Sequence, residues 1–368
     1  MGTWSKVGKM GFIAGGGPVN WFPGHMASAT TAIRNRLKLA DLVIEVRDAR
    51  IPLSSANEYL QSLISSKRRV IALNKKDLAN PNIITQWTQY FDSCKQDCIS
   101  INAHSTGSVK KLLSFVELKL KERIPKEPTL LVMVVGVPNV GKSALINSIH
   151  HIASSRSPVQ EKMKRATVGP LPGVTQDIAG YKIAHQPSIY VLDSPGVLVP
   201  RIPDIETGLK LALTGSVKDS VVGEERLAKY LLAVLNTRKT PLRWSNLENR
   251  REEKLGSEAM VDKNNIIREP FPRRTAQSNP SDVRSFEDIG IDVQRALHAT
   301  LSEFEGDLED ENELESLINK QLRALRKAFK IWHRSDDEAF IKVSKKLLTL
   351  FRIGRLGTFT LDAVPSLG

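Results

Sequence analysis

The stretch TLLVMVVGVPNVGKSALINSI, residues 129–149, decides the fold of this chain. It begins with an uninterrupted apolar run, residues 130–135, which is typical of a strand buried on both faces. Residues 136–143 then match the pattern G-x-x-x-x-G-K-[ST] without a gap, and a helical pattern of apolar residues follows. Because strand, glycine-rich loop and helix come in this order, the stretch predicts a phosphate-binding loop.

The residue types of this loop indicate its chemistry. Glycines allow backbone N–H groups to surround phosphate oxygens, and the N-terminus of the following helix adds positive potential. Lys142 is expected to contact the β- and γ-phosphates, and the Ser143 hydroxyl is expected to hold Mg²⁺. The neighbouring loop residues complete the predicted contacts with the nucleotide: Val140, Gly141 and Ala144.

The composition is that of an ordinary globular protein with a basic surface. The 368 residues are 41% hydrophobic and 25% charged, and no apolar run approaches the ~20 residues that a membrane span needs. Cys94 and Cys98 are too few for a disulfide scaffold or a structural zinc site. The net charge of +13 predicts a polyanionic partner. No acidic residue precedes Asp41, which resembles an organelle transit peptide.

Apolar strands are expected at residues 41–46, 69–73 and 98–101, alternating with helices. Two more strands, near residues 180–184 and 188–192, follow the phosphate loop. Since polar motifs come directly after several of these strands, the predicted fold class is α/β. We expect a doubly wound, mostly parallel sheet of six strands, with the ligand at the carboxyl edge and a smaller helical C-terminal domain.

The motif Asn74-Lys75-Lys76-Asp77 follows the second predicted strand and indicates which base is bound. A carboxylate at Asp77 can accept hydrogen bonds from N1–H and the 2-amino group of guanine, a donor pair that adenine lacks. Asn74, Lys75 and Lys76 are expected to brace the loop and the base. These residues predict a guanine nucleotide, GTP or GDP.

Other loops complete the predicted nucleotide site. Asn102 and Ala103, at the end of the third strand, are expected to support the guanine O6 through a backbone N–H. Residues 193–196, DSPG, match D-x-x-G, so Asp193 is expected to contact Mg²⁺ through water and the Gly196 N–H to bond the γ-phosphate.

Thr175 is the predicted mobile threonine that completes the Mg²⁺ shell, and Thr167 is the alternative. Ras-like enzymes carry a glutamine after D-x-x-G to orient the attacking water, whereas this chain carries Val197. An aliphatic side chain cannot orient water, so slow intrinsic hydrolysis is expected. The loop around Asn139 resembles that of potassium-activated GTPases, which implies that Asn139 helps to coordinate K⁺.

The motifs are in an unusual order, because residues 74–77 precede the phosphate loop by about 60 residues. This order, the motif WFPGHM at 21–26, Asp48-Ala-Arg50 and the ending GRLGTFTLD at 354–362 resemble the circularly permuted YlqF/YawG GTPases. The match is to the RbgA-like branch, which includes the mitochondrial ribosome-associated and DAR GTPases. It is strong over about residues 20–240 and loose in the tail, and Ser194 stands where the family often has threonine.

The resemblance implies a GTPase that matures the large ribosomal subunit and is activated by it. It implies a mitochondrial location, with plastid and cytoplasm as alternatives. The expected ligands are GTP and GDP, the expected partner is the large ribosomal subunit with its rRNA, and the protein is expected to be a monomer. His25, inside WFPGHM, is expected to orient the attacking water; the alternative is a surface or capping residue. Two other functions stay open. One is a GTP-dependent binding module with incidental hydrolysis, and the other is a cytosolic or nuclear pre-ribosome GTPase.

The C-terminal region predicts an amphipathic helix after an acidic run at residues 303–315. One face is expected to be apolar and to include Phe329 and Trp332. Basic residues follow the opposite face: Lys320, Arg323, Lys327, Lys330 and Arg334. This face either contacts an RNA backbone or is simply solvated.

Five regions are therefore expected along the chain. Residues 1–20 are predicted to be a mobile N-terminal segment and residues 21–215 the permuted GTPase domain. Residues 216–240 are predicted to be a helical connector, and residues 241–288 a flexible polar insertion. Residues 289–368 are predicted to form the helical, basic domain that binds RNA or the ribosome.

Overall fold

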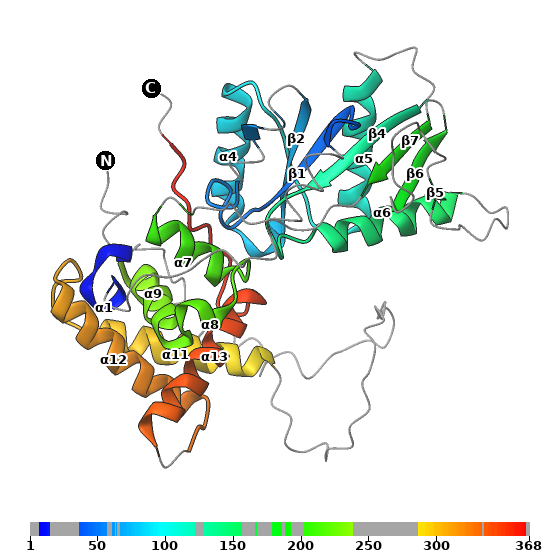
Figure 1. Ribbon diagram of the computed structural model, residues 1–368. Helices are drawn as coiled ribbons and strands as arrows, with labels where there is room; N and C mark the ends of the chain where they lie inside the picture. Colours follow the sequence, from blue (N-terminus) through cyan, green and yellow to red (C-terminus); the bar gives the residue numbers. More distant parts are fainter. Residues whose placement is uncertain are drawn as a thin grey trace, which may run out of the picture. The chain divides into compact units, whose positions relative to one another are not determined.

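The computed structural model describes residues 7–14, 37–56, 61–62, 64, 67–121, 129–156, 166–167, 179–185, 188–192, 202, 204–237, 286–332 and 335–365. The chain divides into two compact units. The sheet unit consists of residues 14–223 and 357–368, and the helical unit of residues 1–13 and 224–356. Figure 1 labels most of the helices and strands of both units. None of the described helices is long and apolar enough to cross a membrane.

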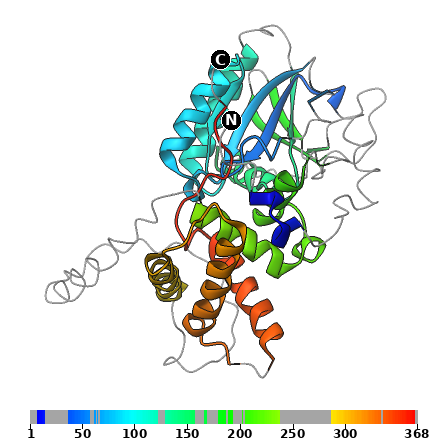
Figure 2. The same cartoon turned by 90° about the vertical axis from the view of Figure 1, so that its left-hand side faces the viewer.

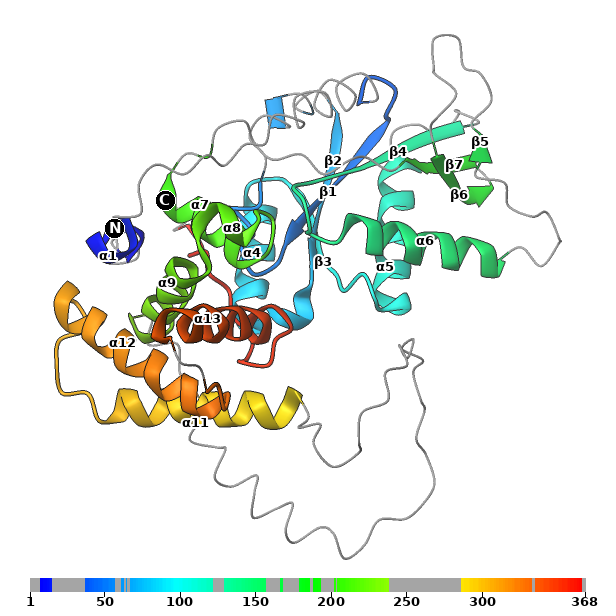
Figure 3. The same cartoon turned by 60° about the horizontal axis from the view of Figure 1, so that its bottom comes forward.

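The sheet unit is built around a sheet whose described part has seven strands, in the order β3-β2-β1-β4-β7-β6-β5 (labelled in Figure 3). The strands are β1 (Leu42–Asp48), β2 (Arg68–Asn74), β3 (Asp97–Ser100), β4 (Thr129–Val135), β5 (Ala166–Thr167), β6 (Ala179–His185) and β7 (Ser188–Leu192). The five strands β3, β2, β1, β4 and β7 are parallel to one another. Strand β6 pairs antiparallel with β7, and β5 pairs antiparallel with β6. The predicted doubly wound α/β fold is confirmed, and the strand beyond the six expected is the short edge strand β5.

One face of the sheet is covered by α4 (Pro81–Ser93). Trp87 and Phe91 of this helix pack against Ile71 and Leu73 of β2 in a buried apolar cluster. The helix has a defined start, because the Asn80 side chain accepts hydrogen bonds from the first backbone N–H groups. This cluster holds the carboxyl end of β2, and therefore the loop that follows it, in place.

The opposite face is covered by α5 (Thr106–Lys121) and α6 (Lys142–Arg156), which lie side by side in Figure 3. The chain moves outward from β1 to β3 and then returns to β4, so right-handed crossovers place α5 and α6 opposite α4. The sheet unit also contains η3 (Lys76–Leu78), α7 (Ile205–Leu213) and α8 (Asp219–Val222).

The connections of the sheet reverse direction between β1 and β4, which are neighbours. The chain leaves β1 toward β2 on one side and leaves β4 toward β7 on the other. Loops that diverge from adjacent parallel strands open a crevice at their carboxyl ends, where ligands bind in sheets of this type. The phosphate loop follows β4, and the motif Asp48-Ala49-Arg50 follows β1.

The helical unit contains η2 (Val7–Lys9), α1 (Gly11–Ala14), α9 (Glu224–Thr237), α11 (Phe286–Ser302), α12 (Glu311–Ala328) and α13 (Asp336–Arg352). The last three helices pack together, as Figure 2 shows. Asn236 of α9 and Gln321 of α12 form a buried reciprocal amide pair with two hydrogen bonds of 2.9 Å. A pair of this kind satisfies both amides and sets the register of the two helices.

Residues 7–14 differ from the expected mobile segment, because they are anchored to the helical unit. Val7 and Ile13 are buried, and the Ile13 carbonyl accepts a hydrogen bond from Arg226 of α9. The Gly11 backbone N–H donates to the carboxylate of Glu311 at the start of α12. Likewise, α9 is a core helix of this unit rather than a plain connector, since Leu227, Leu231 and their neighbours are buried. The expected insertion, residues 241–288, lies largely outside the described residues.

Candidate functional site

The phosphate loop has backbone angles that only certain residues adopt readily. Gly136 has φ +152°, and a Cβ there would lie 2.4 Å from the Val46 carbonyl oxygen. Gly141 has φ +98°, and a Cβ there would lie 2.2 Å from Nδ2 of Asn74. Asn139 lies between them with φ 59°. Both glycines are therefore required by close approach as well as by conformation.

Lys142 and Ser143 start α6 at the end of this loop. The Lys142 side chain is 7% exposed, and its Nζ donates a 2.9 Å hydrogen bond to the Val137 carbonyl, which holds the ammonium group across the loop. Ser143 is exposed in the first turn of the helix, where a hydroxyl is accessible to a cation or a phosphate. Ala144 follows and is partly buried.

Asn74 connects three loops of the site through its side chain. It lies at the end of β2 and is 2% exposed. Its Nδ2 donates to the Val140 carbonyl in the phosphate loop at 2.8 Å, and its Oδ1 accepts from the Ala103 N–H at 2.9 Å. The loops after β2, β3 and β4 are therefore joined by one side chain.

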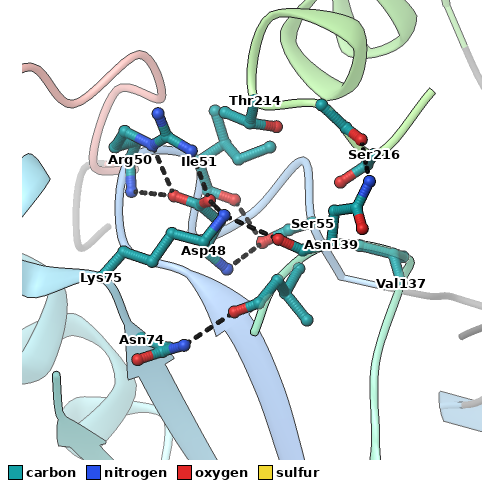
Figure 4. A network of polar contacts seen from close by, with 12 residues as sticks. Asp48, Arg50, Ile51, Ser55, Asn74, Lys75, Val137, Asn139, Thr214 and Ser216 are labelled. Atoms are coloured by element: carbon teal, nitrogen blue, oxygen red, sulfur yellow. Dashed lines mark hydrogen bonds and ion pairs between the residues drawn. The ribbon is translucent and has the colours of Figure 1, made fainter. Parts of the chain in front are cut away.

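Lys75 adds a second connection to the phosphate loop. It has a left-handed backbone, φ 60° and ψ 37°, at the start of η3. Its Nζ donates to the Asn139 carbonyl at 2.6 Å and forms an ion pair with the Asp48 carboxylate at 2.9 Å (Figure 4). One ammonium group thus connects the loops after β1, β2 and β4.

Asp48 and Arg50 form the buried centre of this network. The Asp48 carboxylate accepts hydrogen bonds from the backbone N–H, Nε and a terminal nitrogen of Arg50 at 2.8–3.0 Å (Figure 4). Burial raises the pKa of Asp48, but the charges of Arg50 and Lys75 outweigh that effect and lower the pKa to about 2. The carboxylate is therefore ionised at neutral pH.

Sequence reasoning did not assign Asp48 or Arg50 to the site, because it used this motif only as a mark of resemblance. One signal was present. The motif directly follows an apolar strand, in the same way as the phosphate loop and residues 74–77. Residues at the ends of neighbouring parallel strands come together at one edge of the sheet.

The residues predicted to read guanine lie at the ends of β2 and β3, which are adjacent strands. Lys76 and Asp77 are exposed in η3, and the Lys76 N–H donates to the Ile101 carbonyl at 3.1 Å. Asn102 accepts from the His104 N–H at 2.8 Å, which makes a tight turn after β3. The Ala103 carbonyl accepts from the Ser148 hydroxyl of α6 at 2.5 Å, so this loop is held from both sides.

Asn139 also connects the phosphate loop to the segment after α7. Its Nδ2 donates to the Gly215 carbonyl at 2.6 Å (Figure 4). The Ser216 hydroxyl donates to the Pro138 carbonyl at 2.8 Å. Sequence reasoning did not anticipate Gly215 or Ser216, which carry no recognisable motif.

Several predicted residues lie outside the part of the chain that the structure describes. These are His25, Thr175, Asp193, Gly196 and Arg334. Thr167, the alternative mobile threonine, lies in β5 and pairs with Ala179 of β6.

The predicted cationic helix corresponds to α12 and the residues just after it. Lys320, Arg323 and Lys327 are exposed on the helix, and Lys330 is exposed beyond its end. Lys320 forms an exposed ion pair with Glu303 of the acidic run at 2.9 Å.

Trp332 does not lie on the apolar face of this helix, so that expectation was wrong. The helix ends at Ala328 and is capped by Phe329, and Lys330 then turns the chain with φ 52°. Because helical periodicity stops there, the Trp332 side chain is 82% exposed.

The chain is similar in sequence to known GTPases. Residues 131–267 match a family model described as 50S ribosome-binding GTPase. The chain is 67% identical over 359 residues to Short integuments 2, mitochondrial, of Arabidopsis thaliana, covering 98% of this chain and 93% of that protein. It is 39% identical over 352 residues to DAR GTPase 2, mitochondrial, of the same plant, covering 94% and 91%. The chain belongs to the circularly permuted DAR GTPase family.

A bacterial relative is less similar in sequence. Ribosome biogenesis GTPase A of Bacillus cereus is 37% identical over 221 residues, covering 58% of this DAR GTPase and 70% of the bacterial protein. The predicted family and the predicted GTPase activity are confirmed. Both plant relatives that span almost the whole chain are named mitochondrial, and this DAR GTPase is a mitochondrial protein.

Proposed function

We propose that this DAR GTPase is a K⁺-stimulated switch that matures the large ribosomal subunit in the mitochondrion, with hydrolysis accelerated by that particle. The carrying observation is the Asn74 side chain, which joins the loops after β2, β3 and β4 into one frame for a guanine nucleotide. The description of the matching family model, 50S ribosome-binding GTPase, supports the large ribosomal subunit as the partner. The name Ribosome biogenesis GTPase A, carried by the bacterial relative, supports a role in assembly.

In this proposal the base and the phosphates are bound by different loops. The exposed Asp77 carboxylate accepts from N1–H and the 2-amino group of guanine, while Asn102 and Ala103 line the O6 side. Lys142 exchanges its bond to the Val137 carbonyl for the β- and γ-phosphates. That exchange keeps the ammonium group satisfied in both states, so nucleotide binding leaves no buried charge unpaired.

Two cations fit the residues present. Ser143, Thr175 and Asp193 would hold Mg²⁺, and the exposed Ser143 hydroxyl at the start of α6 is accessible for that contact. Asn139 would hold K⁺ through Oδ1, because its Nδ2 is bonded to the Gly215 carbonyl and orients the amide. Bound at these residues, the cations would supply positive charge beside the phosphates, as an arginine finger does in other GTPases.

Hydrolysis depends on a group that orients water. Val197 cannot do so, and we assign that role to His25, which would be brought into place on the ribosomal particle. Gly196 would donate its N–H to the γ-phosphate, and loss of that phosphate would release the loops that carry Thr175 and Gly196.

The helical unit supplies the proposed rRNA contact. Arg323, Lys327 and Lys330 are exposed along and just after α12, and Arg334 extends the series in the sequence. Lys320 joins them when its exposed ion pair with Glu303 opens. Trp332, exposed beside Lys330 in the chain, provides an aromatic surface on which an unpaired base can stack.

The test is steady-state GTP turnover with and without purified mitochondrial large ribosomal subunits, in K⁺ and in Na⁺. We expect the particle to raise turnover by roughly two orders of magnitude, and K⁺ to exceed Na⁺ in both cases. Small ribosomal subunits are the matched control. If large subunits bind the protein without changing turnover, the protein is a GTP-dependent binding module and the switch proposal is wrong.

A further inference from the structure

The last described residues return to the sheet unit after the chain has completed the helical unit. Residues 357–368 belong to the sheet unit, whereas residues 224–356 belong to the helical unit. We call residues 359–362, Phe-Thr-Leu-Asp, the C-terminal strap. All of its side chains are buried against the sheet unit, although no helix or strand includes them.

The strap holds the loop that carries the guanine-reading residue. The Phe359 N–H donates to the Leu78 carbonyl at 3.1 Å, and the Asn80 N–H donates to the Thr360 hydroxyl at 3.2 Å. Leu78 and Asn80 closely follow Asp77 in the chain. The backbone position of Asp77 is therefore set in part from the C-terminal end of the protein.

The strap also holds the turn after Asp48 and Arg50. The Leu361 N–H donates to the Arg50 carbonyl at 2.6 Å. The Asp362 carboxylate accepts from the backbone N–H groups of Leu53 and Ser54 at 2.8 Å each, and from the Ser54 hydroxyl at 2.7 Å. Charge-assisted bonds of this kind are stronger than neutral ones, so this turn is tied firmly to Asp362.

A third contact reaches α7. Lys210 of this helix forms an ion pair with Asp362 at 3.2 Å. Soon after the helix ends, the Gly215 carbonyl accepts the bond from Asn139 of the phosphate loop. The strap thus contacts three elements: the guanine-reading loop, the turn after β1 and α7. The first is bonded to the phosphate loop through Lys75, and the second reaches Lys75 through its ion pair with Asp48. The third leads into Gly215, which accepts the bond from Asn139.

We propose that Asp362 and Thr360 are positioning residues of the nucleotide site, which set the rate of nucleotide release and the discrimination for guanine. Neither residue is assigned a contact with GTP; both act through the loops that they hold. The strap begins directly after the helical unit in the chain, so one of the covalent links between the two units leads straight into these hydrogen bonds. The inference rests on the proposed role of Asp77 as the guanine-reading residue and not on the ribosomal partner.

The test compares Asp362→Ala and Thr360→Val with the matched control Asp310→Ala. Asp310 also accepts hydrogen bonds from two backbone N–H groups, those of Asn312 and Glu313, but does so at the start of α12 in the helical unit. Release of a fluorescent GDP analogue is measured by stopped flow. Each variant is measured at a temperature the same number of degrees below its own thermal unfolding midpoint. Competition between GTP and ITP, which lacks the 2-amino group, measures discrimination for guanine.

We expect Asp362→Ala to release GDP about tenfold faster and to lose much of its preference for GTP over ITP. Thr360→Val should show a smaller change in the same direction, and Asp362→Asn should recover part of the wild-type rate. The control should lose stability without any change in release. If Asp362→Ala and Thr360→Val both release GDP and discriminate ITP as wild type does, the strap only stabilises the fold and the proposal is overturned.

Discussion

Two lysine ion pairs in this protein have the same length and very different surroundings. Lys75 Nζ lies 2.9 Å from the Asp48 carboxylate, with side-chain exposures of 23% and 1%. Lys320 Nζ lies 2.9 Å from the Glu303 carboxylate, with exposures of 53% and 64%. Distance alone does not separate these pairs, but burial does, because a buried charge has lost its water and depends on its protein partners.

The two surroundings suit two kinds of ligand. The network around Asp48, Lys75 and Asn74 is held together by hydrogen bonds and ion pairs within the protein, and a fixed network of this kind suits a ligand of fixed shape. The cations of α12 are exposed and surrounded by water and salt. They suit a long polyanion, whose binding is driven by charge and weakened by salt.

Asp48→Asn tests the buried side of this comparison. It leaves the guanidinium of Arg50 and the ammonium of Lys75 facing a neutral amide, and we expect a loss of about 3–5 kcal/mol of unfolding free energy. The measurement is urea denaturation followed by circular dichroism. Glu303→Gln removes one carboxylate from the exposed pair and should cost no more than about 1 kcal/mol. Equal losses in the two variants would show that burial does not distinguish the pairs.

The dependence of stability on pH also tests the buried ion pair of Asp48. The pKa of Asp48 is lowered from 3.8 to about 2, so its stabilising effect is complete above about pH 4 and is lost as pH falls through about 2. The shift corresponds to about 2 kcal/mol. The difference in unfolding free energy between wild type and Asp48→Asn, measured with urea from pH 5 downward, should shrink by about 2 kcal/mol as the carboxylate becomes protonated. A constant difference down to the lowest pH would contradict the lowered pKa.

Neutralising the α12 cations tests the exposed side. With Arg323, Lys327 and Lys330 changed to Gln, we expect about tenfold weaker binding to a mitochondrial rRNA fragment at low salt. The slope of log K against log salt should shrink by about one for each phosphate contact removed. Fluorescence anisotropy across a salt series measures both quantities. Lys110→Gln with Lys111→Gln, at exposed positions of α5, is the control and should leave the slope unchanged.

Much of the site was predictable because its parts are local. The phosphate loop, residues 74–77 and residues 102–103 each follow an apolar strand, and parallel strands bring their carboxyl ends to one edge. The helical stripe of α12 was predictable from periodicity up to Ala328. It failed at Trp332, because Lys330 takes a left-handed backbone that no hydrophobic pattern records.

The sequence by itself determined the chemistry of each loop and the permuted order of the motifs. Glycine at 136 and 141, Lys142 and Asp77 are short-range choices, set by backbone freedom and by the groups that a phosphate or a guanine presents. Only the tertiary structure decided how these loops are joined. Asn74 reaches the Val140 carbonyl across 66 residues of chain, and Asp362 reaches Ser54 across 308. Bonds over such separations form only when the sheet and its connections bring distant segments together, and no local pattern of residues encodes that event.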